Sequence, residues 1–260
     1  MRVGAAGAAP TADSVPPVRE KDGRSVTGRV LTLAFALGAF AAQPGTAEDC
    51  EPERAEGPVT IESCEIDGTE FRLLRAEVVV QGSIPSAIAM LEDADACPEW
   101  QGICEEETAT SLEQPFQSLR NRISGSGLSR RVTIVRSGWL RTSDGRVIND
   151  IAGADDLTPE FEGRRVLCMY LRWFLTPGDE EGTVKVVQET VSDPQVPGGL
   201  GRMLANRGAM NAMMETFTNF GPQLGDARYA SGPDLASLPL VEEELPDLGE
   251  EFVACQAARQ

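Results

Sequence analysis

A series of strands joined by short turns and closed by one long helix is the feature that most constrains the fold. Two of the turns, "SDG" at 143–145 and "GDEEG" at 178–182, are hairpin signals, so the strands that flank each of them must run antiparallel. Aliphatic and β-branched content predicts strands at 71–82, 116–124, 131–142, 146–154, 164–177 and 182–193. Residues 83–97 predict a helix that Ser83 caps, and residues 99–115 predict an extended segment.

The long helix is predicted at residues 199–225, shortly after the last strand. Its apolar residues recur three and four positions apart and form one broad face: Leu200, Met203, Leu204, Met210, Met213, Met214, Phe217 and Phe220. An antiparallel sheet with one buried face and one helix to cover it predict an α+β fold in which the sheet curves around the helix. Aromatic residues make up 5% of the chain, so few large side chains fill the interior and an internal apolar cavity is expected.

The glycine-rich loop before this helix, "VPGGLGRMLAN" at 196–206, is the kind of turn that holds a pyrophosphate in dinucleotide-binding folds. Such a site also needs a parallel strand after the helix, and here Gly221-Pro222 and an acidic segment follow instead. We therefore predict a structural role. Gly199 and Gly201 would form a hinge and let the start of the helix approach the sheet closely.

Residues 1–47 have the features of a secretory signal peptide with a long n-region. The apolar run "VLTLAFALGAFAA" follows Arg24 and Arg29, and small residues at Gly45 and Ala47 favour cleavage after Ala47. The run is short for a membrane span, and an uncleaved anchor is the alternative. A secreted or periplasmic protein is expected.

All six cysteines follow this segment, which fits disulfides formed in an oxidising compartment. Proximity along the chain favours Cys50–Cys64 and Cys97–Cys104, which leaves Cys168 to pair with Cys255. Six cysteines allow about 15 pairings, so this connectivity is a hypothesis. A zinc site is the weaker alternative, because the chain has no C-x-x-C motif and no histidine.

Charge and composition exclude several classes of function. The chain has no histidine, so a Ser–His–Asp hydrolase is excluded, and neither a metal nor a cofactor is expected. The net charge of −18 opposes binding to nucleic acid and to anionic membrane surfaces. The polar lead at 48–69 holds two cysteines, and the acidic tail at 226–260 is expected to be irregular and partly mobile.

Four segments, in order, resemble START-type lipid-binding domains, the steroidogenic-acute-regulatory-protein-related lipid transfer family. "SDPQVPGGLGRMLAN" is similar to the Asp-Pro…Pro…Asn stretch that opens the family's last helix. "LEDADACPEW", with Asp93 and Trp100, resembles the segment after its early helix. The resemblance covers residues 70–225.

The other two segments are strands. "GLSRRVTIVRS" resembles the family's Leu-Ser-Asp-Arg-Asp strand, with Arg131 at the Arg position, but Arg130 and Val132 stand where its two Asp residues would be. That departure puts in doubt the buried charge pair that the family often has there. "GRRVLCMYLRWFLTP" resembles its Arg…Trp-x-Leu-x-Pro strand, with Arg165, Trp173 and Pro177.

The resemblance implies a helix-grip fold that encloses a lipid or other apolar molecule and does not act as an enzyme. The long helix and the loop at 151–163 would be the gate, and the protein would bind or transfer its ligand as a monomer, with transient membrane contact. Candidate cavity residues are Arg131, Trp139, Met169, Leu171, Trp173, Met203, Met210, Met213 and Phe217. Ordinary core packing is the alternative for the methionines and the tryptophans, and a surface position is the alternative for Arg131.

Two other functions fit the same sequence. One is a cavity enzyme of the same superfamily, of cyclase or hydratase type, that uses Asp, Glu or Tyr. The other is an envelope protein that binds a partner through its acidic surface and has a filled core. The acidic residues Asp155, Asp156, Glu160 and Glu162 lack EF-hand spacing, which favours a solvated loop over a calcium site.

Overall fold

The computed structural model describes residues 50–114, 116–125, 130–158 and 162–259. Its strands are β1 (Cys50–Glu56), β2 (Val59–Glu65), β3 (Arg72–Gln81), β4 (Cys104–Ser111), β5 (Gln117–Gly125), β6 (Arg130–Thr142), β7 (Val147–Gly153), β8 (Arg164–Arg165), β9 (Leu167–Pro177), β10 (Thr183–Asp193) and β11 (Leu240–Val241). Its helices are α1 (Ile84–Glu92), α2 (Cys97–Trp100), α3 (Gly198–Leu224) and α4 (Leu248–Ala257), with 3-10 turns η1 (Ala94–Ala96), η2 (Ala227–Tyr229) and η3 (Leu235–Ser237).

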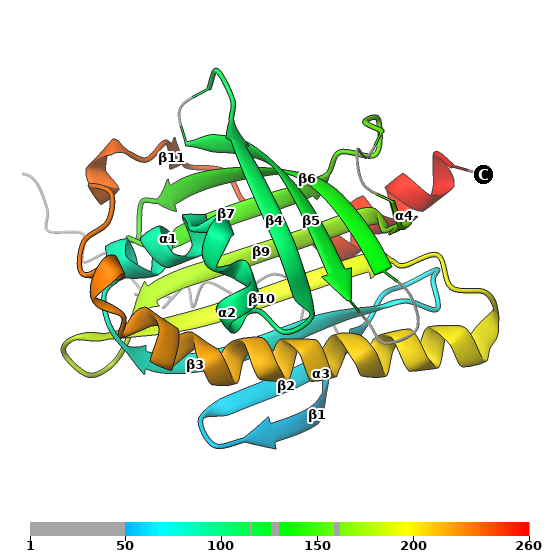
Figure 1. The fold of residues 1–260 in the computed structure, drawn as a ribbon, viewed down its shortest axis with the longest axis horizontal. Helices are drawn as coiled ribbons and strands as arrows, with labels where there is room; N and C mark the ends of the chain where they lie inside the picture. The colour runs from blue at the N-terminus through cyan, green and yellow to red at the C-terminus, as the bar shows by residue number, and fades with distance from the viewer. Residues whose placement is uncertain (1–49, 115, 126–129, 159–161, 260) are drawn as a thin grey trace, which may run out of the picture. The chain divides into compact units, whose positions relative to one another are not determined.

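The main sheet is antiparallel and open, in the order β1-β2-β3-β10-β9-β7-β6-β5-β4, while β8 and β11 pair in parallel with β6. The predicted fold class is confirmed, because this curved sheet packs against the single long helix α3 (Figure 1). The lead predicted at 48–69 is itself a hairpin, β1–β2, and it extends the sheet through β3. In β2 the alternate residues Val59, Ile61 and Ser63 are buried. This alternation was not recognised in the sequence, because the lead is rich in acidic residues.

The core lies between the concave face of the sheet and the helices α1, α2 and α3. Ser83 caps α1 as predicted, since its hydroxyl accepts a hydrogen bond from the Ser86 N–H at 3.2 Å. In the centre of this core the Trp173 and Phe217 rings stack with centroids 5.6 Å apart, and the Trp100 ring meets Phe220 edge to face at 5.5 Å. Such aromatic pairs bury large apolar areas and fix the helix on the sheet.

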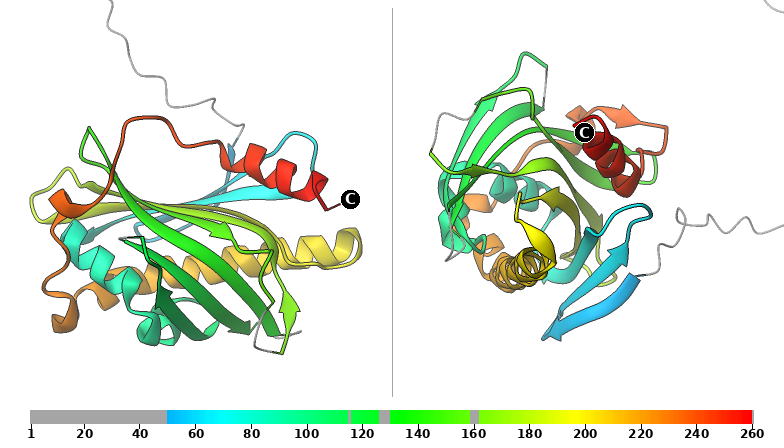
Figure 2. Two further views of the ribbon diagram at one scale, coloured as in Figure 1. Left: turned by 90° about the horizontal axis from the view of Figure 1, so that it is seen from above. Right: turned by 90° about the vertical axis from the view of Figure 1, so that its right-hand side faces the viewer.

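Helix α4 lies on the opposite face of the sheet from α3, as Figure 2 shows. Asp247 caps it by accepting from the Glu250 N–H at 3.0 Å, and Leu248 and Phe252 are buried on the sheet. The Glu251 carboxylate accepts from the buried Arg172 of β9 at 3.1 Å. The tail therefore differs from the irregular chain expected at 226–260, because its few apolar residues meet an apolar patch on the convex face.

All six cysteines are paired. The disulfides are Cys50–Cys64, Cys97–Cys104 and Cys168–Cys255, which confirms the predicted connectivity and removes the zinc alternative. Three disulfides are compatible with an extracellular or periplasmic location. No helix among the described residues is long and apolar enough to cross a membrane. The predicted signal segment lies outside the described residues.

Candidate functional site

The concave face of the sheet bounds a small interior cleft of about 30 Å³. Its lining is half polar: Leu91, Gln101, Glu107, Arg120, Arg122, Thr133, Val135, Asn149, Ile151, Met169, Leu171 and Trp173. A volume of about 30 Å³ is the share of one water molecule in the liquid, whereas ligand pockets have roughly 300–1,000 Å³. The interior expected to hold an apolar ligand is thus closed in this state, and the aromatic cluster around Trp173 fills its deep end.

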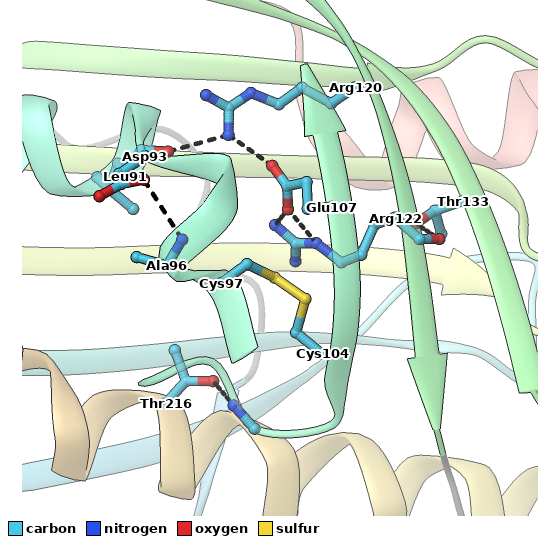
Figure 3. The surroundings of a disulfide bond; sticks show 11 residues. Leu91, Asp93, Ala96, Cys97, Cys104, Glu107, Arg120, Arg122, Thr133 and Thr216 are labelled. Carbon is cyan, nitrogen blue, oxygen red and sulfur yellow. Dashed lines mark hydrogen bonds and ion pairs between the residues drawn. A yellow bond between two sulfur atoms is a disulfide. The ribbon is translucent and has the colours of Figure 1, made fainter. Parts of the chain in front are cut away.

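A chain of charged side chains crosses the wall of this cleft. Glu107 of β4 lies between two arginines of β5 (Figure 3), with Arg120 Nη1 2.7 Å from its Oε1 and Arg122 Nε 2.5 Å from its Oε2. The side chains of Glu107 and Arg120 are 1% and 5% exposed. Arg120 Nη1 also donates to the Leu91 carbonyl at 2.9 Å, and Nη2 lies 2.8 Å from the Glu92 carboxylate without hydrogen-bond geometry.

This network gives Glu107 a structural role in the closed state, because an arginine occupies each of its carboxylate oxygens. It differs from the single buried carboxylate that a cavity enzyme would use as a general base. Removing Glu107 would leave the buried Arg120 with only the partly exposed Glu92 as an ionic partner, and breaking a buried pair costs about 3–5 kcal/mol. The cleft therefore has a fixed polar wall on β4 and β5 and an apolar wall on β9.

A second and larger space lies outside the core, between the β1–β2 hairpin and the first half of α3. This outer groove has a volume of about 590 Å³. It is lined by Glu53, Ser63, Glu70, Arg72, Leu74, Gly199, Arg202, Met203, Asn206, Arg207 and Met210. Its volume falls in the range of small-molecule sites. One hydrogen bond ties the hairpin to the helix beside it, from Arg54 Nη1 to Asn211 Oδ1 at 2.9 Å.

The groove exists because the inward face of α3 is only partly covered along its first half. Beyond residue 212 that face is buried by the sheet, α1 and α2. Before it, Met203 is 59% exposed, and Leu200 and Leu204 on the neighbouring face are 69% and 47% exposed. The predicted apolar face is buried from Ala212 onward, whereas along the first half the side that lines the groove mixes Met203 and Met210 with Arg202, Asn206 and Arg207.

The predicted cavity residues divide into three sets. Met169, Leu171 and Trp173 line the cleft, and Met203 and Met210 line the outer groove. The other four line neither space. Trp139, Met213 and Phe217 are buried in the core, where Trp139 Nε1 donates to Glu92 at 2.6 Å.

Arg131, the last of these candidates, is half-buried and lies on the same face of β6 as Thr133 and Val135. Burial lowers the pKa of its guanidinium, and the nearby Arg164 lowers it further. Sequence reasoning did not identify the charged residues that line the cleft, which are Glu107, Arg120 and Arg122. Two arginines two positions apart on a strand were a signal, but only the register of β4 on β5 shows that Glu107 faces them.

The predicted hinge and gate contain the following contacts. A Cβ added at Gly199 would meet no atom within 4 Å, so the close approach to the sheet is not seen there, and the left-handed turn is made by Gly198 at φ +72°. In the gate loop Arg165 donates to the Ala154 carbonyl at 2.6 Å, and Asp156 pairs with Arg136 at 2.9 Å. Hinge and gate motion stay predictions.

Two acidic residues of this loop, Asp155 and Asp156, already have partners, whereas Glu162 is exposed and makes no hydrogen bond or ion pair with another described residue. Asp155 accepts from the Cys168 N–H at 3.0 Å and lies 3.4 Å from Arg259. Glu160 lies outside the described residues. Two groups of cysteine and carboxylate atoms come close enough to hold a metal, Cys97, Cys104 and Glu107, and Asp155, Cys168 and Cys255. The cysteines of both are in disulfides and offer no thiolate.

Comparison with solved structures finds the same architecture in lipid transfer proteins. A STAR-related lipid transfer protein from Xanthomonas axonopodis superposes with a TM-score of 0.61 at 16% identity, covering 68% of this chain and 99% of that one. Human StAR-related lipid transfer protein 5 gives 0.60 at 13% identity, covering 69% and 88%. Human STARD10 gives 0.55 at 12% identity, covering 74% and 84%.

No model of a known protein family matches the sequence, and no curated protein matches it. The likeness is therefore one of structure. It includes the curved antiparallel sheet and the long helix that the four sequence segments predicted, and extends over about two thirds of the chain or more in each superposition. The described chain has the START-type helix-grip fold.

Proposed function

We propose that this protein binds a lipid or another apolar small molecule between α3 and the sheet, and carries it between membranes. The observation that supports the proposal best is the partly uncovered first half of α3, where Met203 and Met210 line an open groove. Burying apolar ligand surface contributes about 25 cal/mol per Å². A ligand that covers these side chains would therefore stabilise its own complex.

Binding in the interior requires the first half of α3 to move. The cleft of about 30 Å³ must widen at least tenfold to reach the volume of a ligand site. Methionine suits such a change, because its unbranched side chain packs against many shapes. The Glu107–Arg120–Arg122 network would form the polar wall of the widened cleft.

We propose binding rather than catalysis, because the buried carboxylate of the cleft is held by two arginines. We further propose that the protein acts outside the cytoplasm, after cleavage of residues 1–47, and as a monomer that meets membranes transiently. The three disulfides support the location.

The test is to purify the exported protein and examine it by native mass spectrometry and solvent extraction. We expect a co-purifying lipid with the wild type and much less with Met203→Glu, which places a charge in the groove at an exposed position. Leu240→Glu is the matched control, since Leu240 is 45% exposed on β11 and lines neither space. A chain that neither carries a lipid nor takes one up from vesicles would refute the proposal.

A further inference from the structure

The lining of the outer groove favours one chemical class of ligand. We propose that the groove binds a single-chain amphiphile with an anionic head, such as a carboxylate or a phosphate ester. Arg202 and Arg207 would hold the head, and Met203, Met210 and Leu74 would contact the tail. This deepens the proposed function and rests on it.

The first half of α3 carries positive charge in a strongly acidic protein. From residue 194 to residue 214 the chain contains two arginines, Arg202 and Arg207, and no acidic residue, whereas the whole chain has a net charge of −18. Arg72 of β3 adds a third guanidinium to the same groove. A guanidinium at this place offers an anion a local attraction that the acidic remainder of the surface does not.

The availability of these arginines differs. Arg207 is exposed and makes no hydrogen bond or ion pair that the structure shows within the described ranges. Arg202 pairs with Glu70, whose side chain is 75% exposed, so a ligand anion can replace that carboxylate at little cost. Arg72 is held by Glu65 at 2.8 Å and by Ser63 at 3.4 Å. Arg207 is thus the first contact for an anionic head.

The two carboxylates that line the groove are both held away from Arg207 by other contacts. Glu70 pairs with Arg202, and Glu53 accepts a hydrogen bond from the buried Ser63 hydroxyl at 2.7 Å. Glu65 neutralises Arg72 and Glu70 neutralises Arg202, so Arg207 is the lining arginine with no carboxylate partner among the described residues. A guanidinium also presents several donors in a plane, which matches carboxylate and phosphate oxygens.

The groove reaches from the exposed Arg207 to apolar residues at the edge of the core. Leu74 is 6% exposed and belongs to the core, and Met210 packs against that core, whereas Arg207 is exposed. Met203 also lines the groove and is 59% exposed. An amphiphile with its head at Arg207 would therefore place its tail against Met203, Met210 and Leu74.

The experiment compares palmitate with hexadecanol, which has the same tail and a neutral head, by calorimetric titration of the mature protein. We expect palmitate to bind more tightly than hexadecanol, and the difference to shrink at high salt. Arg207→Gln should weaken palmitate binding about three- to tenfold, the loss of one charge-assisted contact at a partly exposed site, and leave hexadecanol unchanged. Arg146→Gln, an exposed arginine in the β6–β7 turn, is the matched control and should bind both ligands as the wild type does.

The outcomes separate this inference from the proposed function. Equal affinity for the two ligands, or palmitate binding that Arg207→Gln does not change, would overturn the anionic preference and leave lipid binding standing. Failure to bind either ligand counts against lipid binding itself. Inorganic phosphate distinguishes a lipid head from a free anion. If it displaces palmitate at comparable concentration, the groove is an anion site and the amphiphile assignment fails.

Discussion

The two halves of α3 differ in their inward side chains and in their environment. In the second half, Phe217 and Phe220 are 1% and 0% exposed and stack among Trp100 and Trp173. In the first half, Leu200 is 69% exposed, and the inward stripe faces an open groove. One half therefore holds the fold together, and the other is only partly covered.

The boundary between the halves is a close contact with the α2–β4 turn. Gly102 lies so near the helix that an added Cβ would be 2.5 Å from the Ala212 carbonyl oxygen. The Gly102 N–H also donates to the Thr216 hydroxyl at 3.0 Å, and the Asn219 amide donates to the Trp100 carbonyl at 3.4 Å. If the first half of α3 moves, it would pivot about this contact, because the second half is packed against β3 and against α1 and α2.

The largest effect is expected from removing a ring of the anchored half. Phe217→Ala should lower the free energy of unfolding by about 3–5 kcal/mol, since it leaves a cavity against Trp173. Met203→Ala, in the open half, should change it by less than about 0.5 kcal/mol. Urea unfolding followed by tryptophan fluorescence measures both. Equal losses in the two variants would show that the first half is also packed, contrary to the exposure of Met203.

Sequence reasoning predicts the helix and its face but not where that face is covered. The spacing of Leu200, Met203 and Phe217 is helical throughout, and the observed bounds differ from the predicted ones by one residue at each end. Whether a stripe is buried depends on the elements opposite it. Those are α1, α2 and β3 for one half and the polar β1–β2 hairpin for the other, and the sequence did not predict that hairpin as strands.

The polar wall of the cleft and the C-terminal helix were missed for a related reason. Glu107 and Arg120 are far apart in sequence, and only strand register brings them together. Helix α4 carries three glutamates or aspartates around its start, so its composition indicated an irregular tail. Its stability comes from Phe252 on the convex face and from the disulfide to Cys168, both of which are tertiary contacts.

A smaller loss of stability is expected from a substitution that overcrowds the contact between Gly102 and Ala212. Gly102→Ala places a methyl group against the backbone of Ala212, which cannot yield as a side chain does, and should cost about 1–3 kcal/mol. Ligand exchange should become faster at the same time, because the helix is pushed away from its pivot. Circular dichroism melts and a fluorescent lipid-release assay measure the two effects. Unchanged stability would mean that the boundary is not a fixed contact.

The smallest effect on stability is expected at the N-terminal end of α3. Substitutions there also distinguish a change in stability from a change in helix motion. At Gly199 a Cβ has no neighbour within 4 Å, and at Gly201 its nearest is Val196 at 3.4 Å, so alanine fits at both positions. Replacing both should stabilise the protein by up to about 1 kcal/mol, because alanine restricts the unfolded chain and favours helix. If the first half of α3 must loosen to admit a lipid, the same change should slow ligand exchange by up to about fivefold, the kinetic equivalent of that free energy. A double variant that is more stable yet exchanges ligand at the wild-type rate would show that the helix moves as one rigid piece about Gly102, and that its first glycines are not the hinge.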